Sequence, residues 1–154
     1  SINAYFNRPQ LEGKSTNGLN LFCHSDNLKT VSIGRFPAIE NKFPRIKVIE
    51  KNPGVNDYPI TESSNLLKSA DQVIITASAL NSEEFIDYLQ FAENARIMII
   101  GPSTPMSPLL FNNGISILAG FVITHPSKAI DIILQGGSIK QLKYCGRNVC
   151  LLRP

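Results

Sequence analysis

Small polar and acidic residues in this 154-residue sequence follow short apolar runs at the point where each run ends. The clearest example is Arg96–Phe111, in which Gly101 ends an apolar run and two hydroxyls, Ser103 and Thr104, stand between prolines. Because proline restricts the backbone on either side, these hydroxyls are held in place before a ligand binds. A stiff polar loop after a buried strand is where open α/β sheets bind ligands. The stretch therefore predicts a ligand-binding loop, with a well-formed turn as the structural alternative.

Other predicted strands end in the same way. Their last residues are small, hydroxyl-bearing or acidic: Gly34, Glu50, Thr76 with Ser78, and Thr124. Because the carboxyl ends of parallel strands lie along one edge of a sheet, we expect these residues in one crevice. Two loops, Thr76–Asn81 and Gly101–Pro105, are expected to form opposite walls of one ligand site. Each precedes a helix start, whose unpaired amides and partial positive charge favour an anionic ligand.

The elements that position these loops alternate between strand and helix signals. Apolar runs predict strands at Thr30–Ile33, Ile46–Ile49, Val73–Ile75 and Ile97–Ile100, and then at Ile115–Leu118 and Phe121–Ile123, broken by Ala119-Gly120. Helical patterns occur at Asn65–Ala70, after Ser82, after Ser107 and from Pro126. The alternation predicts an α/β fold, a Rossmann-like, doubly wound, mostly parallel sheet with helices on both faces and Ile97–Ile100 central. A terminal hairpin is expected from Leu142–Tyr144 and Val149–Leu152.

Length and composition set the class of protein. A chain of this length with 43% hydrophobic content suits one domain with a sizeable core. A net charge of +3 with scattered Lys and Arg residues, and apolar runs too short to cross a bilayer, predict neither a nucleic-acid nor a membrane partner. Three cysteines without a dense framework, Cys23, Cys145 and Cys150, indicate a reducing, cytoplasmic location.

The first 18 residues differ from the rest of the chain. Ile2–Asn7 predicts a short helix that ends before Arg8-Pro9, and the polar stretch after it is typical of a linker. Residues 1–18 are therefore expected to be separate from a domain over residues 19–154. We expect the helix to bury Tyr5 and Phe6 on this domain or on a second copy, because exposed rings forgo a favourable burial energy.

Common cofactor and catalytic motifs do not match this sequence. Gly34 is followed by bulky Arg35 and Phe36, so the glycine-rich dinucleotide fingerprint is incomplete. Glu50 ends the second predicted strand, where a carboxylate can bond ribose hydroxyls, and a solvated acid is the structural alternative. The sequence contains no Walker loop and no nucleophile elbow.

Metal ligation is the other chemistry that the residue types allow. Cys23 and His24 are adjacent, and Cys145 and Cys150 are five positions apart. Neither spacing is that of a C-x-x-C pair or an H-E-x-x-H helix, so the zinc signal is weak. Cysteines among apolar neighbours behave as small hydrophobic residues. The sequence therefore favours structural roles for these residues and for His125, and it leaves any metal ligand unassigned.

Several stretches together resemble one known family. They are Ile33–Pro37, Ala70–Thr76, Ser78–Asn81, Gly101–Phe111, Ala119-Gly120 and Gln135–Gly137. From about Leu19 onward, the chain resembles the C-terminal, Rossmann-like domain of a family labelled "putative heavy-metal chelation", formerly a domain of unknown function. The resemblance implies a preceding domain with an enolase-like fold, whose last part resembles Ile2–Asn7, and a site between the two domains. It implies site residues at Gly34, Phe36, Glu50, Thr76, Ser78, Asn81, Gly101, Pro102, Ser103, Thr104 and Pro105.

Two functional classes remain open at this point. The first is heavy-metal chelation or the binding of a small anionic ligand at the strand-end crevice, with a heavy-metal ion or a metal complex as the cofactor. The alternative is an enzyme with a nucleotide-type cofactor, S-adenosylmethionine or a nicotinamide, and Glu50 discriminates because only a ribose needs its carboxylate. A third interpretation is a domain kept for association. Under each interpretation, residues 1–18 are expected to be the tail of a missing N-terminal domain, and the face left open is where a homo-oligomer would form.

Overall fold

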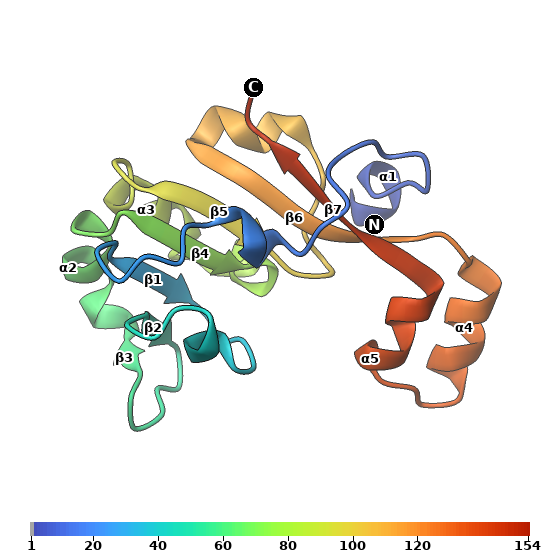
Figure 1. Ribbon diagram of the computed structural model, residues 1–154, viewed down its shortest axis with the longest axis horizontal. Helices are drawn as coiled ribbons and strands as arrows, with labels where there is room; N and C mark the ends of the chain where they lie inside the picture. Colours follow the sequence, from blue (N-terminus) through green and yellow to red (C-terminus); the bar gives the residue numbers. More distant parts are fainter. Residues whose placement is uncertain (1) are drawn as a thin grey trace.

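The computed structural model describes residues 2–154, apart from the side chain of residue 139, and contains one seven-stranded sheet (Figure 1). The strands are β1 (Thr30–Ile33), β2 (Lys47–Glu50), β3 (Tyr58–Pro59), β4 (Gln72–Thr76), β5 (Arg96–Ile100), β6 (Ile115–Ile123) and β7 (Gly146–Leu152). Their order in the sheet is β3-β2-β1-β4-β5-β6-β7. All neighbours pair in parallel except β6 and β7, which are antiparallel. The predicted α/β, mostly parallel and Rossmann-like fold is confirmed.

Short helical segments connect the strands and cover both faces of the sheet. The α-helices are α1 (Ile2–Phe6), α2 (Ser63–Lys68), α3 (Phe85–Phe91), α4 (Pro126–Leu134) and α5 (Ile139–Leu142). The 3-10 helices are η1 (Gly18–Leu21), η2 (Ile39–Asn41), η3 (Ile60–Glu62), η4 (Ala77–Asn81), η5 (Pro108–Asn113) and η6 (Lys143–Cys145). Residues of α2, α3 and η5 join the core on one face, whereas η2 and the segment after η1 contribute Ile39 and Phe22 to the core on the other.

The β5 strand illustrates how the sheet is buried. Ile97 and Ile99 pack into the core on the side of α2 and α3, while Met98 between them packs with Ile39 on the opposite face. All three β5 side chains are at most 1% exposed, and parallel strands flank β5 on both sides. Burial on both faces explains the uninterrupted apolar run, and the predicted position of Ile97–Ile100 inside the sheet is confirmed.

The last two strands correct the prediction for the end of the chain. β6 runs unbroken through Ala119 and Gly120, where the sequence predicts an interruption. A Cβ on Gly120 would lie 2.6 Å from the sulfur of Met106, so this glycine allows close packing within the strand instead of ending it. The predicted terminal hairpin is wrong. Lys143–Cys145 is helical, and β7 pairs along its length with β6.

The paired strands β6 and β7 extend beyond the others and carry α4 and α5 to one side of the molecule (Figure 1). α4 begins at the predicted Pro126 and buries Ala129. Its apolar residues Ile133 and Leu134 are 59% and 80% exposed, because α4 packs against α5 and η6 and away from the main sheet.

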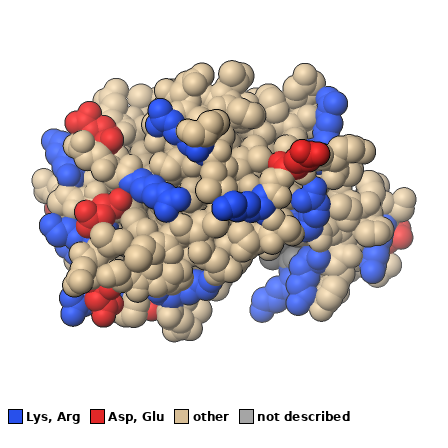
Figure 2. Space-filling model, turned by 45° about the horizontal axis from the view of Figure 1, so that its top comes forward, with Lys and Arg blue, Asp and Glu red and all other residues tan. Residues whose placement is uncertain are grey.

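Charged residues are distributed over the surface. Figure 2 shows Lys and Arg side chains spread over one face, with uncharged surface between many of them. Within residues 2–154, no helix is long and apolar enough to cross a membrane. Two large cavities lie at the edge of the sheet where the parallel strands end, and residues that follow those strands line both of them.

Candidate functional site

The strand order reverses between β1 and β4, and such a reversal is where open α/β sheets bind ligands. The strand ends are level here, because Ile33 pairs with Ile49 on one side and with Ile75 on the other. Beyond them lies a cavity of about 580 Å³, which we call the polar crevice. Among the residues that line it are predicted site residues from three strand ends: Gly34, Glu50, Thr76, Ser78 and Asn81.

Gly34 makes the turn at the base of the polar crevice. Its φ of +88° lies in the left-handed region that favours glycine, and its amide donates a 2.9 Å hydrogen bond to the carbonyl of Ile49. A Cβ here would lie 2.3 Å from Cγ2 of Thr76, so only glycine lets the β1 and β4 ends approach this closely. The Thr76 hydroxyl is in turn 3.0 Å from that of Ser78. The glycine thus sets the place of two hydroxyls at the crevice.

Glu50 faces the polar crevice from the end of β2. Its Oε1 accepts a 2.6 Å hydrogen bond from the backbone amide of Arg35, which fixes one carboxylate oxygen at the β1 turn. No other hydrogen bond to this carboxylate is formed within residues 2–154, so its second oxygen has capacity for a ligand hydroxyl. Glu50 thus lies at the end of the second strand, and its bonding to a ribose stays a prediction.

The Arg35 side chain also belongs to this region, but its charge is already paired. The guanidinium forms ion pairs with Glu40 and Asp57, including a 3.3 Å bond from Nε to Asp57 Oδ2. The hydrogen bond from Arg35 is the main cause that lowers the pKa of Asp57. The pKa of Glu40 is also lowered, first by a hydrogen bond from its own backbone amide and then by the hydrogen bond from Arg35. Arg35 therefore ties η2 to the loop before β3 and is not a free cation for a ligand.

The remaining charges make the polar crevice acidic. Glu50, Glu83 and Glu84 line it, against Lys51 as the unpaired cation among its described lining residues. Tyr88 closes its inner wall at 3% exposure, and burial raises the pKa of the tyrosine, so it stays neutral. The crevice as built favours a neutral or cationic group over an anion.

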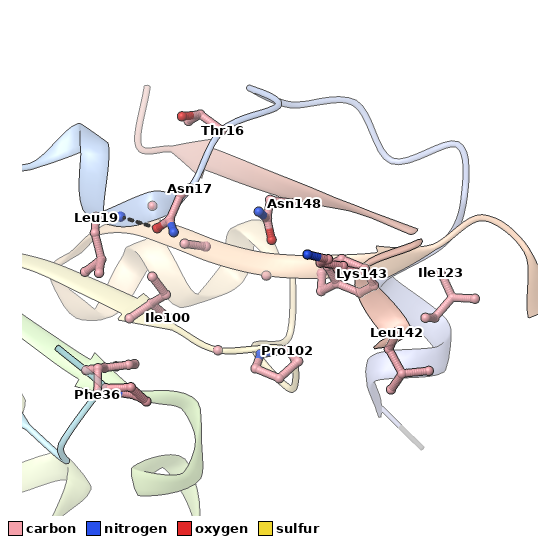
Figure 3. Close-up of a pocket in the computed structure, with 16 residues that line it drawn as sticks. Thr16, Asn17, Leu19, Phe36, Ile100, Pro102, Ile123, Leu142, Lys143 and Asn148 are labelled. Atoms are coloured by element: carbon pink, nitrogen blue, oxygen red, sulfur yellow. Dashed lines mark hydrogen bonds between the residues drawn. The ribbon is translucent and has the colours of Figure 1, made fainter. Parts of the chain in front are cut away.

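A second cavity of about 480 Å³, which we call the apolar cavity, lies over β5 and β6 (Figure 3). Three further predicted site residues line it: Phe36, Gly101 and Pro102. The β4 and β5 loops adjoin between the two cavities, since a Cβ on Gly101 would lie 3.0 Å from that of Ala77. The structure thus divides the predicted site residues between two cavities instead of placing them around one.

The other three predicted residues, Ser103, Thr104 and Pro105, line neither cavity. Ser103 is exposed, whereas Thr104 is fully buried, and its hydroxyl has no hydrogen-bond partner within residues 2–154. The loop is held by two asparagines near the start of the chain. Asn3 donates to the carbonyl of Ser103 at 2.7 Å, and Asn7 both donates to the carbonyl of Thr104 at 2.9 Å and accepts from the amide of Met106 at 3.0 Å.

These contacts explain why the prediction for the first helix is partly wrong. α1 does lie on the domain, but Tyr5 is 64% exposed and Phe6 is partly buried. The Tyr5 and Phe6 rings meet edge to face, with 5.0 Å between their centroids, and the Arg8 guanidinium lies over the Tyr5 ring. The helix is docked by the side-chain amides of Asn3 and Asn7, so the aromatic rings are not its anchor.

We expect an Asn7→Ala variant to lower the free energy of unfolding by about 1–2 kcal/mol, because it leaves the Thr104 carbonyl and the Met106 amide without partners. Hydrogen exchange should quicken at the Met106 amide in particular. Asn3→Ala is the matched control, since it removes one bond from an exposed carbonyl and should leave that exchange rate nearly unchanged. Equal exchange in both variants would show that Asn7 does not hold the loop.

The candidate metal ligands do not come together. Within residues 2–154, no group of three His, Cys, Asp or Glu residues could hold a metal ion. Cys145 and Cys150 are buried, and Cys23 is exposed. His24 stacks on Phe43, and its ring nitrogens lie 3.1 and 3.0 Å from the carbonyls of Lys42 and Leu19. His24 thus links η1 to the end of η2, and this contact is a structural role.

Sequence reasoning missed the polar residues of the apolar cavity. Lys143 and Asn148 line it, and Phe121 contributes to its wall. Asn148 pairs with Phe121 in the β6–β7 ladder, so its position depends on an antiparallel pairing that the local sequence does not predict. Lys143 lies in a segment predicted as strand. The one available signal was the basic, apolar-interleaved composition of the last 15 residues, which does not specify a cavity.

Comparison with known proteins places the chain in a family. Among curated proteins, no match is found. A crystal structure of a protein of unknown function from the DUF364 family of Desulfitobacterium hafniense shares 28% identity and superposes with a TM-score of 0.81, over 97% of this chain and 64% of that one. A second DUF364 crystal structure, from Pyrococcus horikoshii, shares the fold at 24% identity and a TM-score of 0.83, over 98% and 65%. The chain thus spans slightly less than two thirds of either protein. Residues 17–151 match the family model of DUF364, and the chain belongs to this family, whose description is "Putative heavy-metal chelation".

Proposed function

We propose that the polar crevice binds a ribonucleoside-type ligand, with Glu50 accepting hydrogen bonds from the ribose hydroxyls. The observation that carries the proposal is the position of Glu50. It ends β2 beside the strand-order reversal and lines the crevice, and one of its oxygens is fixed by the Arg35 amide while the other makes no hydrogen bond in the described part of the chain. This is where a carboxylate in a Rossmann-like fold receives a ribose.

The charge of the polar crevice selects among nucleoside ligands. A nicotinamide dinucleotide carries a pyrophosphate, which needs a glycine-rich loop or free cations, and Arg35 is already paired with Glu40 and Asp57. S-adenosylmethionine carries a cationic sulfonium and no phosphate, so the carboxylates of Glu50, Glu83 and Glu84 favour it. The ligand we propose is therefore S-adenosylmethionine or a chemically similar, phosphate-free nucleoside.

The family description suggests a link to heavy metals, and the donor set of this chain limits its form. Because no group of three potential ligands exists within residues 2–154, chelation of a bare ion by these side chains has no support. A link to metals would instead require an organic metal complex, or a small molecule that itself chelates a metal, bound in the polar crevice together with the nucleoside.

The division into residues 1–18 and a domain over 19–154 stays a prediction.

The test is calorimetric titration of the purified chain with S-adenosylmethionine, NAD⁺ and Cd²⁺. We expect S-adenosylmethionine to bind more tightly than NAD⁺, and Glu50→Gln to weaken it about tenfold or more, because a charge-assisted hydrogen bond is lost. The glutamine oxygen can still accept from the Arg35 amide, so the turn is preserved. Glu12→Gln, the same charge change at an exposed position outside both cavities, is the control.

Two results would contradict the proposal. One is unchanged affinity for S-adenosylmethionine in the Glu50→Gln variant, which would make Glu50 a solvated acid that only holds the Arg35 turn. The other is tight binding of Cd²⁺ alone without binding of any nucleoside, which would favour direct chelation. A ligand that binds only the folded protein should also raise the thermal midpoint, by an amount that grows with the logarithm of its concentration above Kd, which provides a second measurement.

A further inference from the structure

The apolar cavity is separate from the polar crevice and has a different chemistry. Its volume of about 480 Å³ is within the range of small-molecule sites. Its walls come from η1, from the loop after β1, and from β5, β6 and α5, and they are mostly apolar: Leu19, Phe36, Ile100, Phe121, Ile123 and Leu142. Figure 3 shows Leu19 and Phe36 toward one end of the cavity and Ile123 and Leu142 toward the other.

One cation borders this apolar surface. The Lys143 side chain reaches over the cavity toward Asn148, whose side-chain oxygen is the end drawn nearer to the lysine (Figure 3). Within residues 2–154, Lys143 has no carboxylate partner, and its ammonium lies 4.8 Å from the centre of the Tyr144 ring. The Asn148 amide likewise makes no hydrogen bond in the part of the chain that the structure describes. Asn17 also lines the cavity, and its Oδ1 accepts from the Leu19 amide, while its side-chain nitrogen makes no hydrogen bond in the described part of the chain. The cavity therefore presents one cation and two side-chain amides beside a large apolar surface.

We propose that the apolar cavity binds a small molecule with a compact apolar or aromatic body and a single carboxylate. The apolar body would lie against Ile100 and Ile123, where burial of its surface contributes most of the affinity. The carboxylate would accept hydrogen bonds from the Lys143 ammonium and the Asn148 amide, which fix its orientation. This inference is independent of the nucleoside proposed for the polar crevice, because the two cavities share no lining residue.

The lining disfavours other ligand classes. A nucleotide or other polyanion would need more than the one cation that faces the cavity, and a sugar would leave many hydroxyls against apolar walls. A bare metal ion would find no carboxylate, thiolate or imidazole among the described lining residues. A neutral apolar molecule would fit the walls but would make no use of the Lys143 ammonium, which is exposed beside the Tyr144 ring. The combination of apolar walls and one cation therefore points to a monocarboxylate.

The test uses two probes of the same shape, 2-naphthoate and the neutral 2-naphthalenemethanol, in calorimetric titrations of the whole chain. We expect 2-naphthoate to bind the parent protein and to lose at least tenfold in affinity in Lys143→Met, since methionine keeps the apolar stem and removes the charge. Lys140→Met is the matched control, because Lys140 is exposed on α5 and does not line the cavity. The neutral probe should bind all three proteins alike.

Two further variants locate the probe and guard against misfolding. Lys143→Arg should keep 2-naphthoate binding within about threefold, because it restores the cation. Ile123→Trp should fill the cavity and abolish binding of both probes, while its circular dichroism and its nucleoside binding stay those of the parent. The proposal is overturned if 2-naphthoate binds Lys143→Met and the parent equally, if Ile123→Trp retains both probes, or if neither probe binds the parent protein.

Discussion

A Gly34→Ala variant is expected to lose about 2–5 kcal/mol of the free energy of unfolding, measured by urea denaturation. Two costs add. An alanine at a φ of +88° occupies the left-handed region, which costs about 1–2 kcal/mol. Its Cβ would also lie 2.3 Å from Cγ2 and 2.5 Å from Oγ1 of Thr76, an overlap that costs about 1–3 kcal/mol to relieve. The β1 and β4 ends must then separate, so ligand binding in the polar crevice should fall as well.

Gly114→Ala separates the two costs. Gly114 has nearly the same φ, +83°, but a Cβ there would meet nothing within 4 Å. This control should therefore show the backbone cost alone, about 1–2 kcal/mol. The Gly34→Ala/Thr76→Ala double variant removes the two nearest atoms, Cγ2 and Oγ1, and keeps the Cβ of residue 76 at 3.0 Å, so it should regain part of the loss. Equal losses in Gly34→Ala and Gly114→Ala would mean that Thr76 moves aside freely.

The sheet could be predicted because its signals are local. β5 is buried on both faces, and such a strand needs an uninterrupted apolar run, which Ile97–Ile100 provides. The place of Glu50 at the end of the second strand followed from the same argument, since the end of an apolar run marks the end of a strand. Polar residues at three strand ends, Gly34, Glu50 and Thr76, do meet in the polar crevice.

The remaining features depend on tertiary contacts that leave no periodic pattern. Two hydroxyls flanked by prolines look alike in sequence, yet Ser103 is exposed and Thr104 is buried. The backbone around them is held by distant residues, because Asn3 bonds the Ser103 carbonyl and Asn7 bonds the Thr104 carbonyl and the Met106 amide. Gly120 is typical of a strand break in the sequence, but in the structure it stays within β6 because the Met106 side chain leaves no room for a Cβ there. Lys143 becomes part of a cavity only because β7 returns antiparallel to β6 and places η6 beside the end of β6.

The contact of η1 with the sheet gives the second large effect. Gly18 is buried, and a Cβ on it would lie 2.4 Å from the Cβ of Ala119 and 3.1 Å from Cδ1 of Ile100. We expect Gly18→Ala to lift η1 from the sheet and to lower the free energy of unfolding by about 2–3 kcal/mol, as overpacking does in a filled core. Urea denaturation measures this loss.

The exchanged pair, Gly18→Ala with Ala119→Gly, tests whether this one contact is the cause. The double variant moves the methyl group from the strand to η1, so it should be more stable than Gly18→Ala alone even though Ala119→Gly by itself weakens the strand. η1 also carries Leu19 to the wall of the apolar cavity, so 2-naphthoate binding should weaken in Gly18→Ala and recover in the exchanged pair. If the losses of the two single variants simply add in the pair, then η1 does not rest on Ala119, and the cavity wall is positioned by other contacts, such as the one between His24 and the Leu19 carbonyl.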